Sequence, residues 1–367
     1  MSLRFARVRA LLEQGIADGR HPGAQVYVSQ RGETLASFAV GLARPGEHLP
    51  MNRDTLVPWF SAGKPLTAIG IAQQWEQGQL DLDAPVAETI PEFAQRGKEN
   101  ITVRHLLTHT GGIRSAPYRY PQDDWKTIIQ AICAAGPEPR WEPGEKAGYH
   151  IATSWFILGE IIRRLTGQGI CQYLRKHIFE PIGMTDSWVG MSHEQYEAYE
   201  GRIAVMLKTD RVPPQPQEWH EEASMTHCNP GAAAHGPAWQ LGRFYEMLLA
   251  GGEWEGQRIV TPETVDEFTR RHRESMYDHT FKHVMDWGLG FIIDSKRHGE
   301  PAPYGYGPHA SENTFGHGGN QASIGMADPD HDLVVAIVCT GMPGQSKHQQ
   351  RMESLLAAVY EELGIAG

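Results

Sequence analysis

The sequence lacks the basic excess that binding to polyanions requires. Its 367 residues include 33 Lys and Arg against 44 Asp and Glu, which gives a formal net charge of -11 at pH 7. Nucleic acid and anionic membranes bind to basic faces that displace counterions. We therefore expect neither as a partner, and a small neutral or weakly charged ligand fits the composition better.

Long apolar runs and paired cysteines are also missing. No stretch approaches the roughly 20 apolar residues of a membrane span, and charged residues interrupt the first sixteen positions, unlike a secretory signal. The cysteines are widely spaced and form no Cys-x-x-Cys pair, so we expect buried free thiols instead of a zinc site or a disulfide framework. These features predict a cytoplasmic protein. The four cysteines are Cys133, Cys171, Cys228 and Cys339.

Both ends of the chain predict antiparallel strands and a covering helix. Near the start, apolar residues at helical spacing are followed by two strand patterns, 24–30 and 34–41, around the turn "RGE". Near the end, strand patterns at 322–327 and 333–340 precede a helical pattern over 352–363. The apolar positions of the first helix are Leu3, Val8, Leu11, Leu12 and Ile16.

The middle of the chain is mostly helical in pattern. Residues 154–168 and 239–252 each carry an apolar stripe with a glycine near the end. We therefore predict an α+β fold, with an antiparallel sheet from both termini flanked by helices and a mostly helical insertion. A single domain is expected over residues 1–367. Its α/β part would comprise about 1–60 and 240–367, and its helical part about 61–239.

Two loops are candidates for shaping a pocket. Residues 212–222, "VPPQPQEWHEE", are rich in proline and predict an irregular surface loop. A passive connection and a pocket wall are both open for this loop. The region from about Arg114 to Asp123 is the second candidate, and composition does not set the conformation of either.

The stretch "PWFSAGKPLTA", residues 58–68, carries the first candidate chemistry. Pro65 is tolerated only near the first turn of a helix, so Ser61 lies at a helix start. Residues three apart share a helix face, which allows the Lys64 amine to lie beside the Ser61 hydroxyl. A lysine can activate a serine only if its neutral form is accessible. The helix N-terminus would also favour an oxyanion.

These two residues alone do not establish catalysis. A Ser three positions before a Lys occurs by chance in roughly a third of chains of this composition, and serine is a favoured N-cap. A phosphate-binding P-loop is excluded. Pro58 stands where that motif needs its first glycine, and no Ser or Thr follows Lys64.

Three further stretches follow in a fixed order. They are "ITVRHLLTHTGGI" (101–113), "WEPGEKAGYHIATSWFILGEIIRRLTGQ" (141–168) and "FGHGGNQASIGMADP" (315–329). Together with Ser61 and Lys64 they resemble the beta-lactamase-related serine hydrolases. This superfamily includes class C beta-lactamases, penicillin-binding DD-peptidases, D-aminopeptidases and family VIII esterases. The resemblance extends from the hairpin at residue 24 to the closing helix.

The resemblance implies a beta-lactamase/transpeptidase-like fold and roles for three residues. Ser61 matches the nucleophile, and Lys64 matches the lysine of the Ser-x-x-Lys motif. Tyr149 matches the tyrosine of the second motif, which shares proton transfer with the lysine. Its phenol would be held as phenolate or would pass the proton to the leaving group. The implied partner is a small-molecule acyl substrate, with no metal or organic cofactor, and the oligomeric state is not indicated.

The third motif would complete the site. His317, Gly318 and Gly319 match its three positions, where beta-lactamases and peptidases usually have Lys-Thr-Gly. The N–H of Asn320 would then form the oxyanion site together with the N–H of Ser61. Histidine in place of lysine weakens recognition of a substrate carboxylate, although an imidazole can donate a hydrogen bond and is charged at mildly acidic pH.

The second motif departs further from the family pattern. Ile151 occupies the position of the usual Asn, and its side chain cannot bond a substrate amide or Lys64; Thr153 or Ser154 would have to reach the gap. We therefore predict a Ser61 acyl-enzyme that hydrolyses a small neutral carboxylic ester. The alternatives are a beta-lactamase, a D-amino-acid amidase or peptidase, an acyltransferase, and a catalytically inactive binding relative.

Two further features are interpreted as structural. His105 and His109 have the i, i+4 spacing of metal ligands on a helix, but no Glu follows His105 as in zinc proteases, so we predict no metal site. Gly231 and Gly236 lie in a segment that resembles a chain turn close to the family's site. We expect them to serve backbone geometry only.

Overall fold

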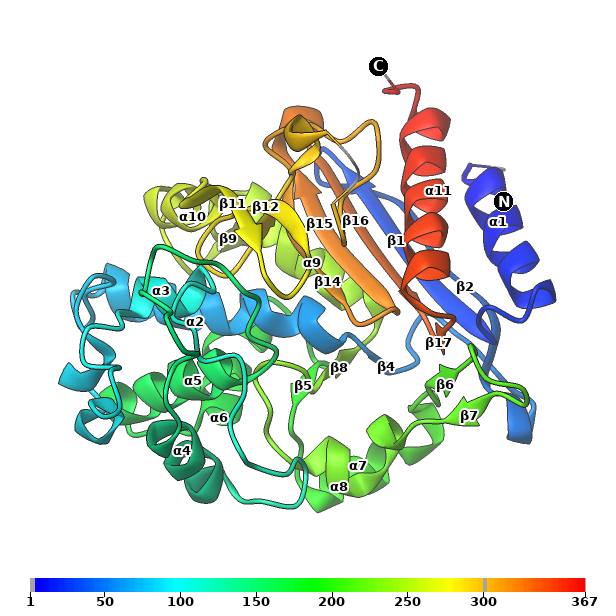
Figure 1. Ribbon diagram of the computed structural model, residues 1–367. Coiled ribbons are helices and arrows are strands. Elements are labelled where there is room, and N and C mark those ends of the chain that lie inside the picture. Colours follow the sequence, from blue (N-terminus) through cyan, green and yellow to red (C-terminus); the bar gives the residue numbers. More distant parts are fainter. Residues whose placement is uncertain (1–3, 300–301, 367) are drawn as a thin grey trace.

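The computed structural model describes residues 4–299 and 302–366. Leu3 of the predicted first helix lies outside the described residues. A nine-stranded sheet lies to one side of the helical part of the molecule, and its neighbouring strands pair antiparallel throughout (Figure 1). In spatial order its strands are β11 (Arg273–Asp278), β12 (His283–Trp287), β13 (Ile292–Ile293), β14 (Phe315–Gly319), β15 (Ser323–Asp328), β16 (Leu333–Cys339), β1 (Gly23–Gln30), β2 (Glu33–Arg44) and β3 (Leu49–Pro50).

The sheet joins the two ends of the chain as predicted. β1 and β2 form the expected hairpin, in which Arg31 and Gly32 both have positive φ, as a tight two-residue hairpin turn requires. β15 and β16 form the second predicted antiparallel pair. β16 then pairs with β1, with Cys339 opposite Ala24.

Helices cover both faces of the sheet. β16 is buried at every position, and its side chains alternate between the two faces. Val335 and Ile337 pack in the same cluster as α1 (Ala6–Ala17) and α11 (Gln345–Leu363). Val334 and Val338 pack in the cluster that contains α9 (Ala238–Leu249). The sheet is therefore the middle layer of three, which explains why β16 is apolar without alternation.

The remaining helices gather mainly beside the β14 side of the sheet (Figure 1). α5 (Thr153–Thr166) confirms the helical pattern over 154–168, and Gly167 ends it with φ 72. The limits of the helical part at 61 and 239 stay a prediction. The other helices are α2 (Lys64–Glu76), α3 (Val103–Leu107), α4 (Trp125–Ala134), α6 (Ile170–Leu174), α7 (His193–Tyr199), α8 (Glu222–Thr226) and α10 (Pro262–Thr269).

In the described part of the chain, short strands form three small sheets apart from the nine-stranded one. β8 (Ala234–Gly236) pairs with both β4 (Val57–Pro58) and β5 (Trp188–Val189), so it joins the chain before Ser61 to the helical part. The other short strands are β6 (Leu207–Lys208), β7 (Gln215–Pro216), β9 (Glu253–Trp254), β10 (Gln257–Arg258) and β17 (Gly341–Met342).

The prediction of four free thiols is wrong for two of them. Cys171 in α6 and Cys228 form a disulfide across 57 residues of sequence. Spacing along the chain could not reveal this pair, because only the tertiary fold brings the two residues together. Cys133 and Cys339 are free and buried, as predicted. Disulfides are typical of oxidising compartments, and the cytoplasmic location stays a prediction.

None of the helices in the described ranges combines the length and apolar character that crossing a membrane would require.

Candidate active site

Ser61 lies where the sheet, α2 and β8 meet. It belongs to a 3-10 turn, Phe60–Gly63, that leads directly into α2. The Trp59 N–H donates to the Ala234 carbonyl at 2.8 Å, and the Ser323 hydroxyl donates to the Trp59 carbonyl at 2.6 Å. β8 and β15 thus hold the backbone immediately before Ser61 from two directions.

Lys64 is fully buried and its amine lies beside Ser61. Its Nζ is 3.0 Å from Ser61 Oγ and donates to the carbonyls of Ile151 at 2.7 Å and Gly231 at 2.5 Å. Burial lowers the pKa of Lys64 well below 10.5. In the neutral amine, two N–H groups are used by the two carbonyls and the lone pair faces the Ser61 hydroxyl. This is the arrangement that a general base needs.

The side chains expected to replace the missing Asn bond elsewhere. The Thr153 hydroxyl donates to a backbone carbonyl, and the Ser154 hydroxyl bonds to the His150 ring. The backbone carbonyl of Ile151 contacts Lys64 instead, while the Ile151 side chain is 60% exposed. The apolar side chain therefore leaves the contact between the second motif and the lysine intact.

Gly231 has a larger role than the backbone geometry we expected. Its carbonyl accepts the shortest of the hydrogen bonds from Lys64, and its N–H donates to Asn229 Oδ1 at 3.0 Å. A Cβ at this position would lie 3.1 Å from the Ile151 carbonyl and from Ala152 Cα. The absence of a side chain thus allows this close approach. The sequence does not reveal this group, because every residue has a carbonyl and no pattern marks one that turns inward.

Tyr149 lies beside the lysine in an aromatic surrounding. Lys64 Nζ is 5.0 Å from the centre of the phenol ring, and His109 and Phe281 each lie 4.7 Å from it. Burial raises the pKa of Tyr149, and the neighbouring Ser61 hydroxyl opposes this by less. The phenolate that we considered is therefore disfavoured, and the protonated phenol is the form that the site holds.

His317 is neutral in this structure. Its Nδ1 donates to the Gly318 carbonyl at 2.7 Å, so Nε2 carries the lone pair; this atom is buried and has no hydrogen-bond partner within the described part of the chain. Burial, with a smaller effect of Lys64, lowers the pKa of His317 to about 3. The expectation of a charge at mildly acidic pH is therefore wrong. A neutral acceptor cannot hold a substrate carboxylate by charge.

The rest of the third motif packs against the Ser61 segment. A Cβ on Gly319 would lie 2.1 Å from the Trp59 carbonyl, so only glycine lets β14 come this close. A Cβ on Gly318 would lie 2.2 Å from the ring of Tyr304. Asn320 follows β14 and is exposed. The structure thus brings the three predicted motifs together.

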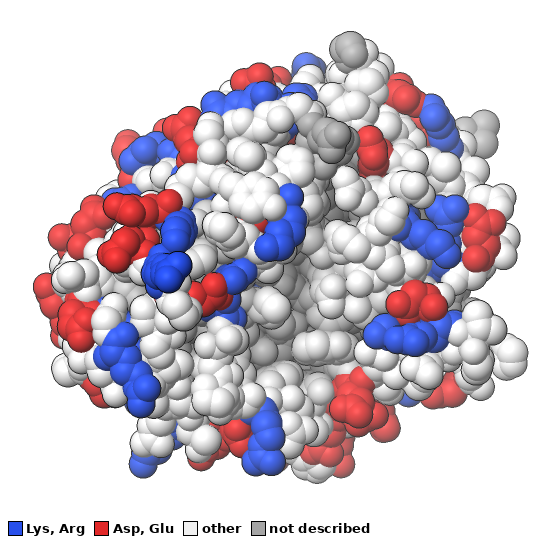
Figure 2. Space-filling view, in the orientation of Figure 1, with Lys and Arg blue, Asp and Glu red and all other residues white. Residues whose placement is uncertain are grey.

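One cavity of about 280 Å³ is lined by Ser61, Tyr149 and, from the third motif, His317, Gly318 and Asn320. None of the described lining residues is Lys, Arg, Asp or Glu, and Figure 2 shows a hollow near the middle of this face with mostly uncharged atoms in it. The lining residues are Phe60, Ser61, Tyr149, Ile151, Trp219, Ala232, Thr280, Phe281, Tyr304, His317, Gly318 and Asn320.

The proline-rich loop supplies part of this wall. Trp219 lies edge-on to Phe60, with their ring centres 5.0 Å apart. Tyr120, from the other candidate loop, stacks on Trp219 at 6.1 Å and is not among the lining residues. The first loop therefore contacts the cavity directly, and the second supports it from behind. Trp219, Thr280, Phe281 and Tyr304 were not predicted, because sequence patterns do not show which loop side chains face a cavity.

The two histidines with metal-ligand spacing have structural partners. His105 Nδ1 accepts from the Thr102 N–H at 3.2 Å and caps α3. His109 Nδ1 accepts from the His150 N–H at 2.9 Å. Within residues 4–299 and 302–366, no group of three or more His, Cys, Asp or Glu side chains could hold a metal ion.

Comparison with known proteins agrees with this geometry. A family model described as Beta-lactamase matches residues 8–359. Esterase EstB of Burkholderia gladioli is 27% identical over 342 residues, covering 85% of this chain and 84% of that protein. The crystal structure of a family VIII carboxylesterase superposes with a TM-score of 0.82 at 28% identity, over 98% of both chains. A penicillin-binding protein homologue from Caulobacter crescentus superposes with a TM-score of 0.80 at 29% identity, over 97% of both chains.

Proposed function

The chain belongs to the beta-lactamase family and is a serine hydrolase, and from that premise we propose that it hydrolyses small neutral carboxylic esters through an acyl-enzyme on Ser61. The observation that carries the choice of substrate is the cavity wall, which holds no charged side chain among its described residues and has neutral His317 at the third motif. Substrates that carry a carboxylate would lose hydration on entering this cavity without gaining a cationic partner.

In the first half-reaction, Ser61 Oγ attacks the ester carbonyl. The neutral Lys64 amine, 3.0 Å away, takes the hydroxyl proton as the new C–O bond forms. The N–H groups of Ser61 and Asn320 stabilise the oxyanion of the tetrahedral intermediate. The intermediate then expels the alcohol, whose oxygen receives a proton from the Lys64 ammonium directly or through the Tyr149 phenol.

In the second half-reaction, a water molecule attacks the acyl carbon. Lys64, neutral again, accepts a proton from that water, with the protonated Tyr149 phenol able to relay it. Collapse of the second intermediate breaks the bond to Ser61 Oγ and returns a proton to that oxygen. The products are one carboxylic acid and one alcohol, and every group of the enzyme regains its initial protonation state.

The test compares three chromogenic substrates on the purified protein. They are p-nitrophenyl butyrate, a chromogenic cephalosporin that carries a carboxylate, and D-alanine p-nitroanilide. We expect kcat/KM for the ester to exceed the other two by about a hundredfold or more, because the cavity lacks groups that pair with a carboxylate or ammonium. Equal or faster turnover of the cephalosporin would refute the ester assignment. Ser61→Ala serves as the control for background hydrolysis.

A further inference from the structure

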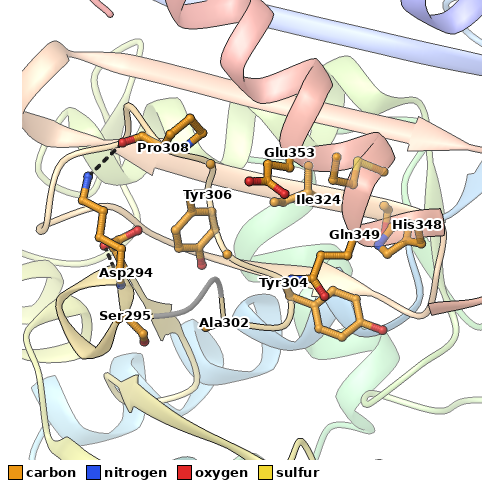
Figure 3. A pocket seen from close by; sticks show the side chains of 16 residues that line it. Asp294, Ser295, Ala302, Tyr304, Tyr306, Pro308, Ile324, His348, Gln349 and Glu353 are labelled. Carbon is orange, nitrogen blue, oxygen red and sulfur yellow. Dashed lines mark hydrogen bonds between the residues drawn. The ribbon is translucent and has the colours of Figure 1, made fainter. Parts of the chain in front are cut away.

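A second cavity of about 240 Å³ lies next to the one that contains Ser61. Figure 3 shows its walls: the chain around Asp294 and Tyr306 on one side, and α11 with Gln349 and Glu353 on the other. Tyr304 lines both cavities, and no other described residue does. Its side chain is therefore the wall between them.

The absence of a side chain at Gly318 explains the place of Tyr304. Gly318 pairs with Ile324 across β14 and β15, so the two residues face the same side of the sheet. The Tyr304 ring fills the space above Gly318, where a Cβ would be only 2.2 Å away. Ile324 lines the second cavity directly beside it. Removal of the ring would thus join the two cavities along the face of the sheet that α1 and α11 cover.

The contacts of Tyr304 lie on both sides of this partition. Its ring centre is 5.8 Å from that of Phe281, which lines the Ser61 cavity, and 5.7 Å from that of His348, which lines the second cavity. Its hydroxyl donates to Gln345 Oε1 at 3.3 Å, near the surface. Packing therefore holds the ring in place more than this long hydrogen bond does.

The second cavity offers apolar surface near the partition. Ala302, Ile324 and Met352 are buried and line it, and the charged side chains of Asp294, Lys296 and Glu353 line it as well, with Glu353 beside Ile324 (Figure 3). An alkyl chain that passed the position of Tyr304 would therefore find apolar contacts. Each buried methylene improves binding by about 0.8 kcal/mol, which is about fourfold in affinity.

We propose that Tyr304 determines the length of substrate that the Ser61 site accepts, and that the second cavity is an extension closed by its ring. This inference rests on the proposed ester hydrolysis. In the wild-type protein, an ester with a short tail fits between Ser61 and the ring. Opening the partition extends the site for the apolar tail of a longer ester.

The experiment measures kcat/KM for p-nitrophenyl esters from acetate to dodecanoate, and for butyrate esters from ethyl to decyl butyrate, so that both ends of the substrate are tested. Wild type and Tyr304→Phe should favour the short members of both series. Tyr304→Ala should raise the ratio of long to short substrate by about tenfold or more in one series, since two or more methylenes become buried. Tyr304→Leu should give an intermediate ratio.

A double variant checks that the second cavity causes the gain. Met352 lines that cavity and not the Ser61 cavity, so Tyr304→Ala/Met352→Phe should return the ratio toward wild type. Unchanged ratios in Tyr304→Ala and Tyr304→Leu, with normal fluorophosphonate labelling of both, would overturn the role of Tyr304 alone. Absence of labelling in the folded wild type would instead overturn the proposed function.

Discussion

Lys64 and His317 are both buried, and burial favours the neutral form of each. Lys64 has two backbone carbonyls and the Ser61 hydroxyl as partners, and burial lowers its pKa well below 10.5. His317 has a pKa of about 3 for the same reason. The lysine can therefore accept a proton from Ser61, and the histidine neither supplies a charge nor titrates near neutral pH.

The first prediction concerns the pH dependence of turnover. In the proposed mechanism the neutral Lys64 amine is the active form. Because its pKa is lowered, kcat/KM for a neutral ester should rise with pH and reach a plateau well below pH 10.5. His317 is neutral above about pH 5, so His317→Gln should keep the shape of the profile between pH 5 and the plateau. A profile that climbs to about pH 10.5, as for an ordinary lysine, would contradict this account.

Residue identities predicted the side chains of the site better than its backbone groups. Ser61, Lys64 and Tyr149 and the third motif come together as the resemblance implied. The carbonyls of Ile151 and Gly231 could not be predicted, since the fold alone decides which carbonyl points inward. Neutral His317 was also missed, because the pKa of an imidazole depends on burial that the sequence does not show.

At the scale of elements, the end of β11 holds Tyr149 in place. Asp278 is buried, and its Oδ1 accepts from the N–H groups of Tyr149 at 3.1 Å, Thr280 at 2.9 Å and Phe281 at 3.0 Å. Its Oδ2 accepts from Arg273, which is also buried, at 3.1 Å. One carboxylate thus joins the second motif to a loop that lines the cavity.

The second prediction is the cost of removing this carboxylate. Asp278→Ala should lower the free energy of unfolding by about 3–5 kcal/mol, because it leaves a buried guanidinium and three N–H groups without their acceptor. It should also reduce kcat, since Tyr149 loses its support. Asp278→Asn keeps one acceptor oxygen and should cost less.

Urea unfolding and steady-state kinetics measure both effects of the Asp278 variants. Asp266→Ala, at an exposed position of α10, is the matched control and should change stability by no more than about 0.5 kcal/mol. An Asp278→Ala protein as stable and as active as this control would contradict the role of Asp278.

Elements with a long periodic pattern were predictable, and short ones were not. The two terminal hairpins, α5 and α9 follow from apolar periodicity. The two-residue β4 and the three-residue β8 have no pattern of their own, and their pairing comes from the tertiary fold. The orientation of Trp219 toward the cavity is likewise set by its contacts with Phe60 and Tyr120.

At the scale of the whole molecule, the site depends on parts that lie far apart in sequence. Ser61 and Lys64 come from the start of α2, and the third motif comes from β14 in the sheet. Gly231 lies in the segment after Cys228, which the disulfide ties to α6. Sequence spacing could not predict this tie, because the two cysteines are 57 positions apart.

The third prediction follows from this covalent tie. Replacing both Cys171 and Cys228 with Ser should lower the free energy of unfolding by about 2–4 kcal/mol, the typical contribution of a disulfide. Turnover should also fall, because the segment that presents the Gly231 carbonyl to Lys64 becomes less constrained. Wild-type protein treated with dithiothreitol should show the same loss. Identical thermal unfolding of oxidised and reduced wild type would contradict this role of the disulfide.

The central claim is that Ser61 is an activated nucleophile, and the mass of the intact protein after brief exposure to a fluorophosphonate probe tests it most directly. The wild type should gain one adduct, because Lys64 can remove the Ser61 proton, and folded Ser61→Ala should gain none. An adduct that persists in Ser61→Ala, or a folded wild type that gains no adduct, would contradict the account.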